Sequence, residues 1–192
     1  MGREFELKFA ANAQVQAAIQ QDFSGFREIA METSYFDTAD GALSERRATL
    51  RLRKENGNCI CTLKTPLPDN SRGEWECQAS DIADGLGTLV SLGAPREVAV
   101  LAGQGLQIVC GAKFTRLVTE VATADGTAEL ALDSGVLLGG GKEAALQEVE
   151  VELKTGSDRA TLAFAEQLAA TYGLLPENKS KFRRALDLAK GE

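Results

Sequence analysis

The sequence predicts an α+β fold whose main layer is an antiparallel β-sheet. Most of the chain alternates polar and apolar residues with a period of two, which is typical of strands with two different faces. Turn sequences interrupt the alternation at Asn56-Gly57, at Asp125-Gly126 and in the glycine triplet 139–141. Asn-Gly and Asp-Gly pairs favour tight two-residue hairpins, and hairpins join antiparallel neighbours.

These turns divide the chain into seven or eight expected strands. The first turn separates residues 49–54 from 58–64, and the second separates residues 115–123 from 127–133. Further strands are expected at residues 4–9, at 72–78 and around 148–153. We expect each strand to turn one face inward and the other face outward.

Helical patterns are fewer, and we expect four helices. Residues 12–22 follow a possible Asn12 cap, and residues 157–172 begin with Ser157 and stop at Gly173. A weaker pattern at 81–92 contains two glycines, and a last helix is expected at about 180–190. Because no repeat, low-complexity tract or long linker interrupts the chain, we expect one domain over residues 1–192.

The charge composition excludes several kinds of chemistry. The 192 residues include 28 Asp or Glu, 21 Lys or Arg and no His, for a net charge of −7. Nucleophile systems that depend on histidine and zinc sites with histidine ligands are therefore excluded. Carboxylates, metal ions bound by oxygen and cationic side chains remain available for hydrolysis. The acidic balance also argues against a nucleic-acid partner.

Cysteine spacing and hydropathy indicate a cytoplasmic protein without a membrane partner. The four cysteines show no C-x-x-C spacing, so free thiols in a reducing compartment are expected. The longest uncharged run, residues 98–112, is shorter than the roughly 20 residues that a membrane helix needs. Residues 1–10 carry four charges and no apolar stretch, so no signal peptide is expected.

Charged side chains share one face of several expected strands. Glu148, Glu150 and Glu152 follow one another about 7 Å apart along one face, and Arg51 and Arg53 do the same on another strand. For one strand this pattern is compatible with a solvated face, but like charges side by side are unfavourable. A closed barrel with inward charges would relieve the repulsion if it held divalent cations and a polyanion. The same alternation recurs at Glu4, Glu6, Lys8, Lys64, Arg72, Glu74, Glu76, Glu129 and Asp133.

Two basic clusters agree with a polyanion. Lys113 and Arg116 stand near the start of a strand, and the start of the last expected helix carries Lys179, Lys181, Arg183 and Arg184. Basic residues near element ends are usually solvated, but cations in a first turn oppose the helix dipole unless an anion lies nearby.

Together, these ordered elements resemble the CYTH superfamily of triphosphate tunnel metalloenzymes. Glu4-x-Glu6-x-Lys8 is similar to the E-x-E-x-K signature of that superfamily, and the later elements follow in order over about residues 3–188. They are Tyr35-Phe36-Asp37-Thr38, Leu50-Arg51-Leu52-Arg53, Thr62-Leu63-Lys64, Arg72-x-Glu74-x-Glu76, Phe114-Thr115-Arg116, Leu132-Asp133, Glu148-x-Glu150-x-Glu152 and Ser180-Lys181-x-x-Arg184. Within the superfamily the spacing is most similar to that of bacterial inorganic triphosphatases.

The resemblance implies a closed eight-stranded antiparallel β-barrel that forms a tunnel, with helices packed outside. It implies that the triphosphate is bound by Lys8, Arg51, Arg53, Lys64, Arg72, Arg116, Lys181 and Arg184. It implies that Mg²⁺ or Mn²⁺ is bound by Glu4, Glu6, Glu148 and Glu150, with support from Glu74, Glu76, Asp133 and Glu152. Hard divalent cations take oxygen ligands and guanidinium groups bind phosphate bidentately, so the residue types suit this chemistry.

The implied reaction is hydrolysis of tripolyphosphate to diphosphate and phosphate by in-line attack of water. Lys8, Arg51, Arg53 and Lys64 would stabilise the transition state, and either Glu76 or Asp133 would position the water. Two alternatives stay open: an organic-triphosphate enzyme of the same superfamily, such as a class IV adenylate cyclase or a thiamine triphosphatase, and a non-catalytic polyphosphate-binding module. The sequence shows no obvious aromatic or amide set for a base, which favours the inorganic substrate.

Overall fold

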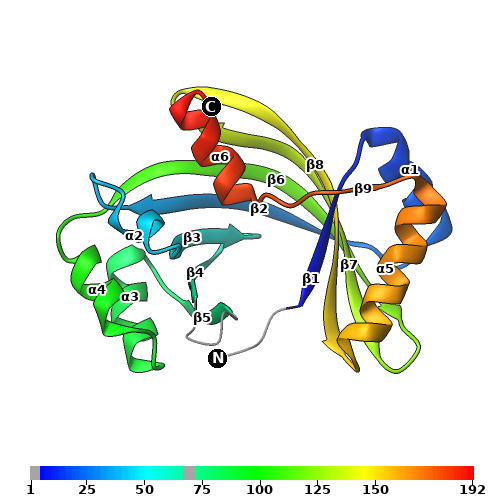
Figure 1. The fold of residues 1–192 in the computed structure, drawn as a ribbon, viewed down its shortest axis with the longest axis horizontal. Helices are drawn as coiled ribbons and strands as arrows, with labels where there is room; N and C mark the ends of the chain where they lie inside the picture. Colours follow the sequence, from blue (N-terminus) through cyan, green and yellow to red (C-terminus); the bar gives the residue numbers. More distant parts are fainter. Residues whose placement is uncertain (1–4, 67–71) are drawn as a thin grey trace.

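A computed structural model describes residues 5–66 and 72–192, apart from the side chain of Arg72. In these residues the chain forms nine strands and six helices (Figure 1). The elements in order are β1 Glu6–Ala10, α1 Ala13–Asp22, β2 Arg27–Asp37, α2 Ala42–Glu45, β3 Thr49–Glu55, β4 Asn58–Pro66, β5 Arg72–Gln78, α3 Ile82–Ser91, α4 Arg96–Ala102, β6 Gln107–Ala122, β7 Thr127–Gly139, β8 Lys142–Thr155, α5 Asp158–Tyr172, β9 Leu175–Pro176 and α6 Lys181–Lys190.

The strands form one antiparallel sheet in the order β5-β4-β3-β2-β6-β7-β8-β1-β9, which confirms the α+β prediction. The expected closed eight-stranded barrel is not confirmed. Over the described residues the sheet is open, with β5 and the two-residue strand β9 at its edges. The long strands curve strongly, so that the sheet bends around its inner face (Figure 1).

Two of the three expected hairpin turns lie where the sequence places them. Asn56 and Gly57 have φ values of +48° and +90°, and Gly140 and Gly141 have φ values of +58° and +74°, which suits tight turns between twisted strands. The predicted position of the third turn, at Asp125-Gly126, is wrong by one residue. The Thr123 N–H donates to the Gly126 carbonyl at 2.9 Å, so the tip consists of residues 124 and 125.

Gly126 is needed there for a different reason. A Cβ at this position would lie 2.1 Å from the carbonyl oxygen of Thr155, at the end of the neighbouring strand β8. The glycine therefore permits close backbone approach between two strands, which sequence reasoning cannot separate from a turn preference.

The four expected helices are confirmed as α1, α3, α5 and α6. Asn12, Asp81, Ser157 and Ser180 cap them, each accepting a backbone N–H from the first turn. The two glycines within α3 do not break the helix. Gly85 allows the helix to pack closely on the sheet, because a Cβ at this position would lie 2.5 Å from Cys61. The short helices α2 and α4 were not expected, since neither is long enough to show a helical period.

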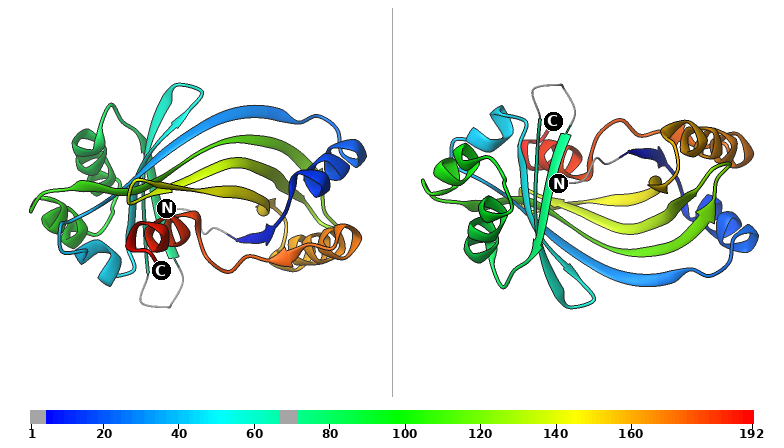
Figure 2. Two further views of the ribbon diagram at one scale, coloured as in Figure 1. Left: turned by 90° about the horizontal axis from the view of Figure 1, so that it is seen from above. Right: turned by 90° about the horizontal axis from the view of Figure 1, so that it is seen from below.

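Helices cover both faces of the sheet (Figure 2), and the buried residues form three hydrophobic clusters within the described part of the chain. The outer face is the one that carries Leu50, Leu132 and Val151, and α1 and α5 pack on it at one end of the long strands while α3 and α4 pack at the other. The inner face carries the charged residues, and α6 packs on part of it through Phe182 and Leu186. No helix among the described residues is long and apolar enough to cross a membrane.

Candidate functional site

The inner face encloses a cavity of about 1010 Å³. Its walls come from eight strands, β1 to β8, and from the start of α6, so the curvature of the sheet creates it. The predicted site residues that line it are Glu6, Lys8, Arg51, Arg53, Lys64, Glu74, Glu76, Arg116, Glu150, Glu152 and Lys181. Asp133 and Glu148 pair with Lys181 of this lining, and Arg184 pairs with Glu148. Glu4 and the side chain of Arg72 lie outside the described residues.

Three carboxylates gather on the inner face, and we call them the acidic triad. Asp133 on β7 pairs directly with Glu148 on β8, and Glu150 follows two residues later on the same face. One oxygen from each of the three lies within 4.8 Å of the others, and all three residues are buried. Three converging carboxylate oxygens are the ligands that Mg²⁺ and Mn²⁺ prefer, so the triad fits such an ion.

Three cations among the described residues pair with the acidic triad. The Lys181 ammonium lies 2.7 Å from Asp133 Oδ2 and 2.7 Å from Glu150 Oε1, and it also pairs with Glu148. Arg116 binds Asp133 with two parallel hydrogen bonds, Nε to Oδ1 at 2.8 Å and Nη2 to Oδ2 at 2.7 Å, and it also pairs with Glu150. Arg184 pairs with Glu148.

Burial and these ion pairs shift the pKa values of the carboxylates and of the cations that pair with them. Burial raises the pKa of Glu148 above its usual range, against the lowering effect of Lys181. Burial also opposes ionisation of Glu150, but Lys181 and Arg116 outweigh it and hold the pKa of Glu150 well below its usual value. Despite their own burial, Lys181 and Arg116 have raised pKa values because the neighbouring carboxylates stabilise their charge. Both stay protonated at neutral pH.

A second group of cations stands on β3 and β4. Lys64 Nζ lies 3.4 Å from Glu74 Oε2, Arg51 Nη2 lies 3.9 Å from Glu74 Oε1, and Arg53 pairs with Glu55. The Nε atoms of Arg51 and Arg53 are buried and have no hydrogen-bond partner among the described residues. Burial and then the charge of Arg51 lower the pKa of Arg53. A bound anion would relieve both the unmet hydrogen bonds and the repulsion.

A row of glutamates crosses three strands at one end of the cavity. Glu129, Glu152 and Glu6 pair in register across β7, β8 and β1. Lys154 Nζ lies 3.1 Å from Glu152 and 3.7 Å from Glu129, and Lys8 Nζ lies 3.2 Å from Glu6. These residues are partly exposed, so the row meets solvent whereas the acidic triad does not.

Several cavity residues were not predicted. Arg27, Lys154 and Thr62 follow the same period-two pattern as their neighbours, so the alternation contained the signal for them. Phe114 and Phe182 also line the cavity, and the Phe114 ring faces the Lys181 ammonium at 5.3 Å. No sequence signal separates such aromatic residues from ordinary core residues.

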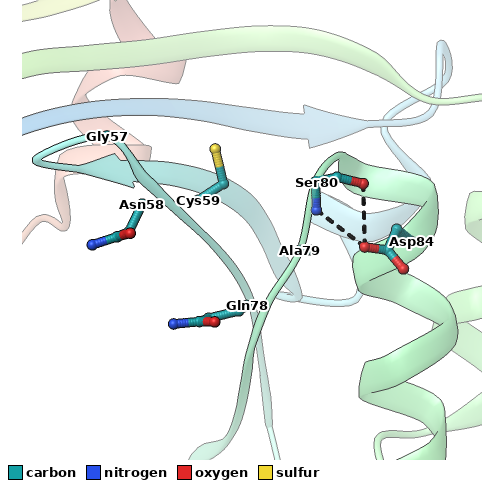
Figure 3. A pocket seen from close by; sticks show the side chains of 7 residues that line it. All are labelled: Gly57, Asn58, Cys59, Gln78, Ala79, Ser80 and Asp84. Atoms are coloured by element: carbon teal, nitrogen blue, oxygen red, sulfur yellow. Dashed lines mark hydrogen bonds between the residues drawn. The ribbon is translucent and has the colours of Figure 1, made fainter.

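A second, smaller pocket of about 370 Å³ lies where the β3–β4 turn meets the start of α3 (Figure 3). Its lining contains one carboxylate, Asp84, whose Oδ2 accepts hydrogen bonds from Ser80 N at 3.0 Å and from Ser80 Oγ at 3.3 Å. The carboxylate is thus used in ordering the start of the helix.

Comparisons with known proteins agree with this geometry. An inorganic triphosphatase from Haemophilus influenzae is 26% identical over 191 residues, which cover 96% of this chain and 54% of that protein. The chain therefore spans about half the length of this curated relative.

Solved structures show the same fold at 20–22% identity. One is a Hippeastrum protein assigned as an adenylyl cyclase and described as having a dominant triphosphatase activity, with a TM-score of 0.66 over 100% of this chain and 97% of that one. A Bacillus halodurans protein assigned as an adenylate cyclase has a TM-score of 0.65 over 96% and 98% of the two chains. The CYTH domain model matches residues 2–186, and the chain belongs to the CYTH family.

Proposed function

We propose that this chain hydrolyses inorganic tripolyphosphate to diphosphate and phosphate in the inner-face cavity, with Mg²⁺ or Mn²⁺. The proposal rests on one observation: carboxylates that could bind a metal ion and cations that could bind phosphate meet at the same cavity. The acidic triad supplies converging oxygen ligands, and Arg51 and Arg53 present buried Nε–H groups that find no acceptor within residues 5–66 and 72–192. A metal-bound polyphosphate satisfies both sets at once.

The cations of the site would bind the phosphates. Arg51, Arg53 and Lys64 on β3 and β4, and Lys8 on β1, border the cavity and would hold the chain of the substrate. Lys181 would turn from the acidic triad to a phosphate when a divalent ion takes its carboxylate oxygens. Such cations stabilise the charge that spreads over the transferred phosphoryl group.

The carboxylates divide between metal binding and water positioning. A bound Mg²⁺ or Mn²⁺ would neutralise phosphate charge and orient the substrate. Both oxygens of Asp133 accept hydrogen bonds from Arg116, so this carboxylate is poorly suited to accept a proton from water. Glu76 borders the cavity, is exposed, and accepts one hydrogen bond from Thr62 at 3.1 Å. We therefore assign the positioning of the attacking water to Glu76.

The curvature of the sheet supports a tunnel around the substrate. We propose that β5 and β1 flank the bound polyphosphate and complete the enclosure that the family resemblance implies. The long charged strands already place groups of both signs around one space. Enclosure would exclude bulk water and strengthen each phosphate contact.

An organic triphosphate is the second candidate substrate, and one observation favours it. Ile29, Met31 and Phe114 make an apolar wall in the cavity beside Arg116, with room for more than three phosphates. An organic group could rest there while its phosphates met the cations.

Phosphate release from purified protein tests the proposal. Tripolyphosphate, ATP and thiamine triphosphate are supplied separately with Mg²⁺ or Mn²⁺, and EDTA serves as the negative control. We expect fastest turnover of tripolyphosphate, and a loss on the order of 100-fold or more in Glu148→Gln. Glu143→Gln is the matched control, because Glu143 is an exposed residue on the same strand. No phosphate release with either metal, or full activity in Glu148→Gln, would contradict the proposal, and preference for ATP or thiamine triphosphate would favour the second candidate.

A further inference from the structure

Gln16 is a buried polar residue on a helix that lies behind the acidic triad. It belongs to α1, where it is 5% exposed, and its neighbours Gln14 and Gln20 are exposed. Helix α1 packs on the outer face of the sheet, beside α5 (Figure 2). The side chain of Gln16 thus approaches the sheet from the side opposite to the cavity.

The Gln16 amide joins two strands at one point. Its Nε2 donates to the backbone carbonyl of Asp133 at 2.9 Å and to that of Glu148 at 3.1 Å. Asp133 and Glu148 are direct partners across β7 and β8, and both are fully buried. A carbonyl oxygen can accept two hydrogen bonds, so these bonds add to those of the sheet.

This contact fixes the backbone of two triad residues from the outer face of the sheet. The carboxylates of Asp133 and Glu148 project to the inner face, where they meet Glu150. A helix anchored to both carbonyls limits movement of β7 and β8 relative to each other and relative to α1. The separation of the two carboxylates depends on that backbone, because short side chains cannot compensate for a shifted strand.

We propose that Gln16 is a positioning residue, which holds Asp133 and Glu148 at the separation that a divalent cation requires. The proposal rests on the metal site of the proposed function. Groups that orient metal ligands from behind typically change metal affinity about 10- to 100-fold when they are removed. The sequence gives no sign of this role, since a glutamine in a polar helix predicts a solvated side chain.

Two substitutions disrupt the paired hydrogen bonds in different ways. Gln16→Met keeps the length of the side chain and has no donor. Gln16→Glu has a similar shape, but its carboxyl donates at most one hydrogen bond when burial keeps it protonated and none when it is ionised, so it cannot serve both carbonyl oxygens. When it is ionised, its negative charge would by itself strengthen cation binding, so weaker binding in this variant cannot be a charge effect.

The test is titration calorimetry of the whole chain with Mn²⁺ alone, together with thermal unfolding in EDTA. We expect Mn²⁺ to bind at least about 10-fold more weakly to Gln16→Met and to Gln16→Glu than to the wild type. Gln14→Met and Gln14→Glu are the matched controls on an exposed position of the same helix, and they should bind Mn²⁺ as the wild type does. In turnover of tripolyphosphate, kcat should fall more than KM changes, because the cations of β3 and β4 are untouched.

The outcomes separate the two proposals. Wild-type Mn²⁺ affinity in either folded Gln16 variant would overturn the positioning role, even if that variant had lost thermal stability. If only one of the two variants folds, that one decides. Failure of the wild type itself to bind Mn²⁺ would overturn the metal site of the proposed function and this inference with it.

Discussion

Lys181 is the cation at the centre of the acidic triad, and its replacement by methionine isolates the role of the ammonium group. The side chain is 11% exposed and contacts all three carboxylates. Lys181→Met keeps an unbranched apolar chain, but it leaves Arg116 and Arg184 as the cations that pair with the three buried carboxylates in the part of the chain that the structure describes. Breaking a buried ion pair by removing one partner costs about 3–5 kcal/mol. For a chain of this length we expect Tm to fall on the order of 10 °C.

The same substitution should strengthen metal binding. In the structure, the ammonium lies 2.7 Å from oxygens of Asp133 and Glu150, which a divalent ion would also need. With the ammonium removed, we expect Mn²⁺ to bind more tightly than in the wild type and to restore most of the lost Tm. Turnover of tripolyphosphate should fall, because the substrate loses one of its cations.

Lys179→Met is the matched control for this experiment. Lys179 lies two residues earlier, its side chain is 62% exposed, and its ammonium lies 2.9 Å from Asp187 Oδ2. An exposed pair of this kind is worth less than about 1 kcal/mol. Calorimetric scans in EDTA and in Mn²⁺, with Mn²⁺ titrations, compare the two variants. Weaker Mn²⁺ binding in Lys181→Met than in the wild type would refute competition for the same oxygens, and equal Tm values for the two variants would refute the stability argument.

Further predictions concern helix packing and thiol reactivity. Gly85→Ala should destabilise by about 1–3 kcal/mol, because the new Cβ would lie 2.5 Å from Cβ and Sγ of Cys61. In the same helix Gly87→Ala should stabilise by about 0.5–1 kcal/mol, since its Cβ would meet no described residue outside the neighbouring helix backbone within 4 Å. Denaturant melts compare the two variants, and equal midpoints would contradict the packing argument. Burial raises the pKa of Cys61 and Cys110 to about 12, so little thiolate forms at pH 8. Cys59 and Cys77 are partly exposed, but burial and the nearby Asp84 raise the pKa of Cys77, so alkylation of the native protein should start at Cys59. Raising the pH toward 12 should accelerate labelling of the two buried thiols, and mass spectrometry that found Cys61 and Cys110 labelled at pH 8 as much as Cys59 would contradict this.

The sequence predicts the charged strands well because the period-two pattern is local. Glu148 and Glu150 alternate with apolar residues, so their shared face follows from strand geometry alone. The residue that lies opposite each of them on the neighbouring strand does not follow from this local pattern. The register that sets Asp133 opposite Glu148 depends on the Gly140-Gly141 turn, and a slip of one residue would send one of the two to the outer face.

Features that depend on tertiary contacts were not predictable. The amide of Gln16 reaches β7 and β8 only because α1 folds back on the outer face, and its sequence neighbours are ordinary surface residues. The short helix α2 begins where the buried Asp37 carboxylate accepts the N–H groups of Leu43 at 2.8 Å and Ser44 at 3.0 Å. Whether the sheet closes is equally non-local, because closure would require β5, at one edge, to meet β1 or β9 at the opposite edge.

The charges of the site also hold α6 in place. Its first turn carries Lys181, Arg183 and Arg184 and no acidic residue, which opposes the helix dipole. Pairing of Lys181 and Arg184 with the acidic triad offsets that cost, and Phe182 adds apolar contact with the inner face. The cations that would bind phosphate therefore also anchor a helix that borders the cavity. Neutralising Glu148 should consequently loosen α6 as well as weaken metal binding, so an activity measurement on Glu148→Gln needs hydrogen exchange of α6 amides beside it to separate the two effects.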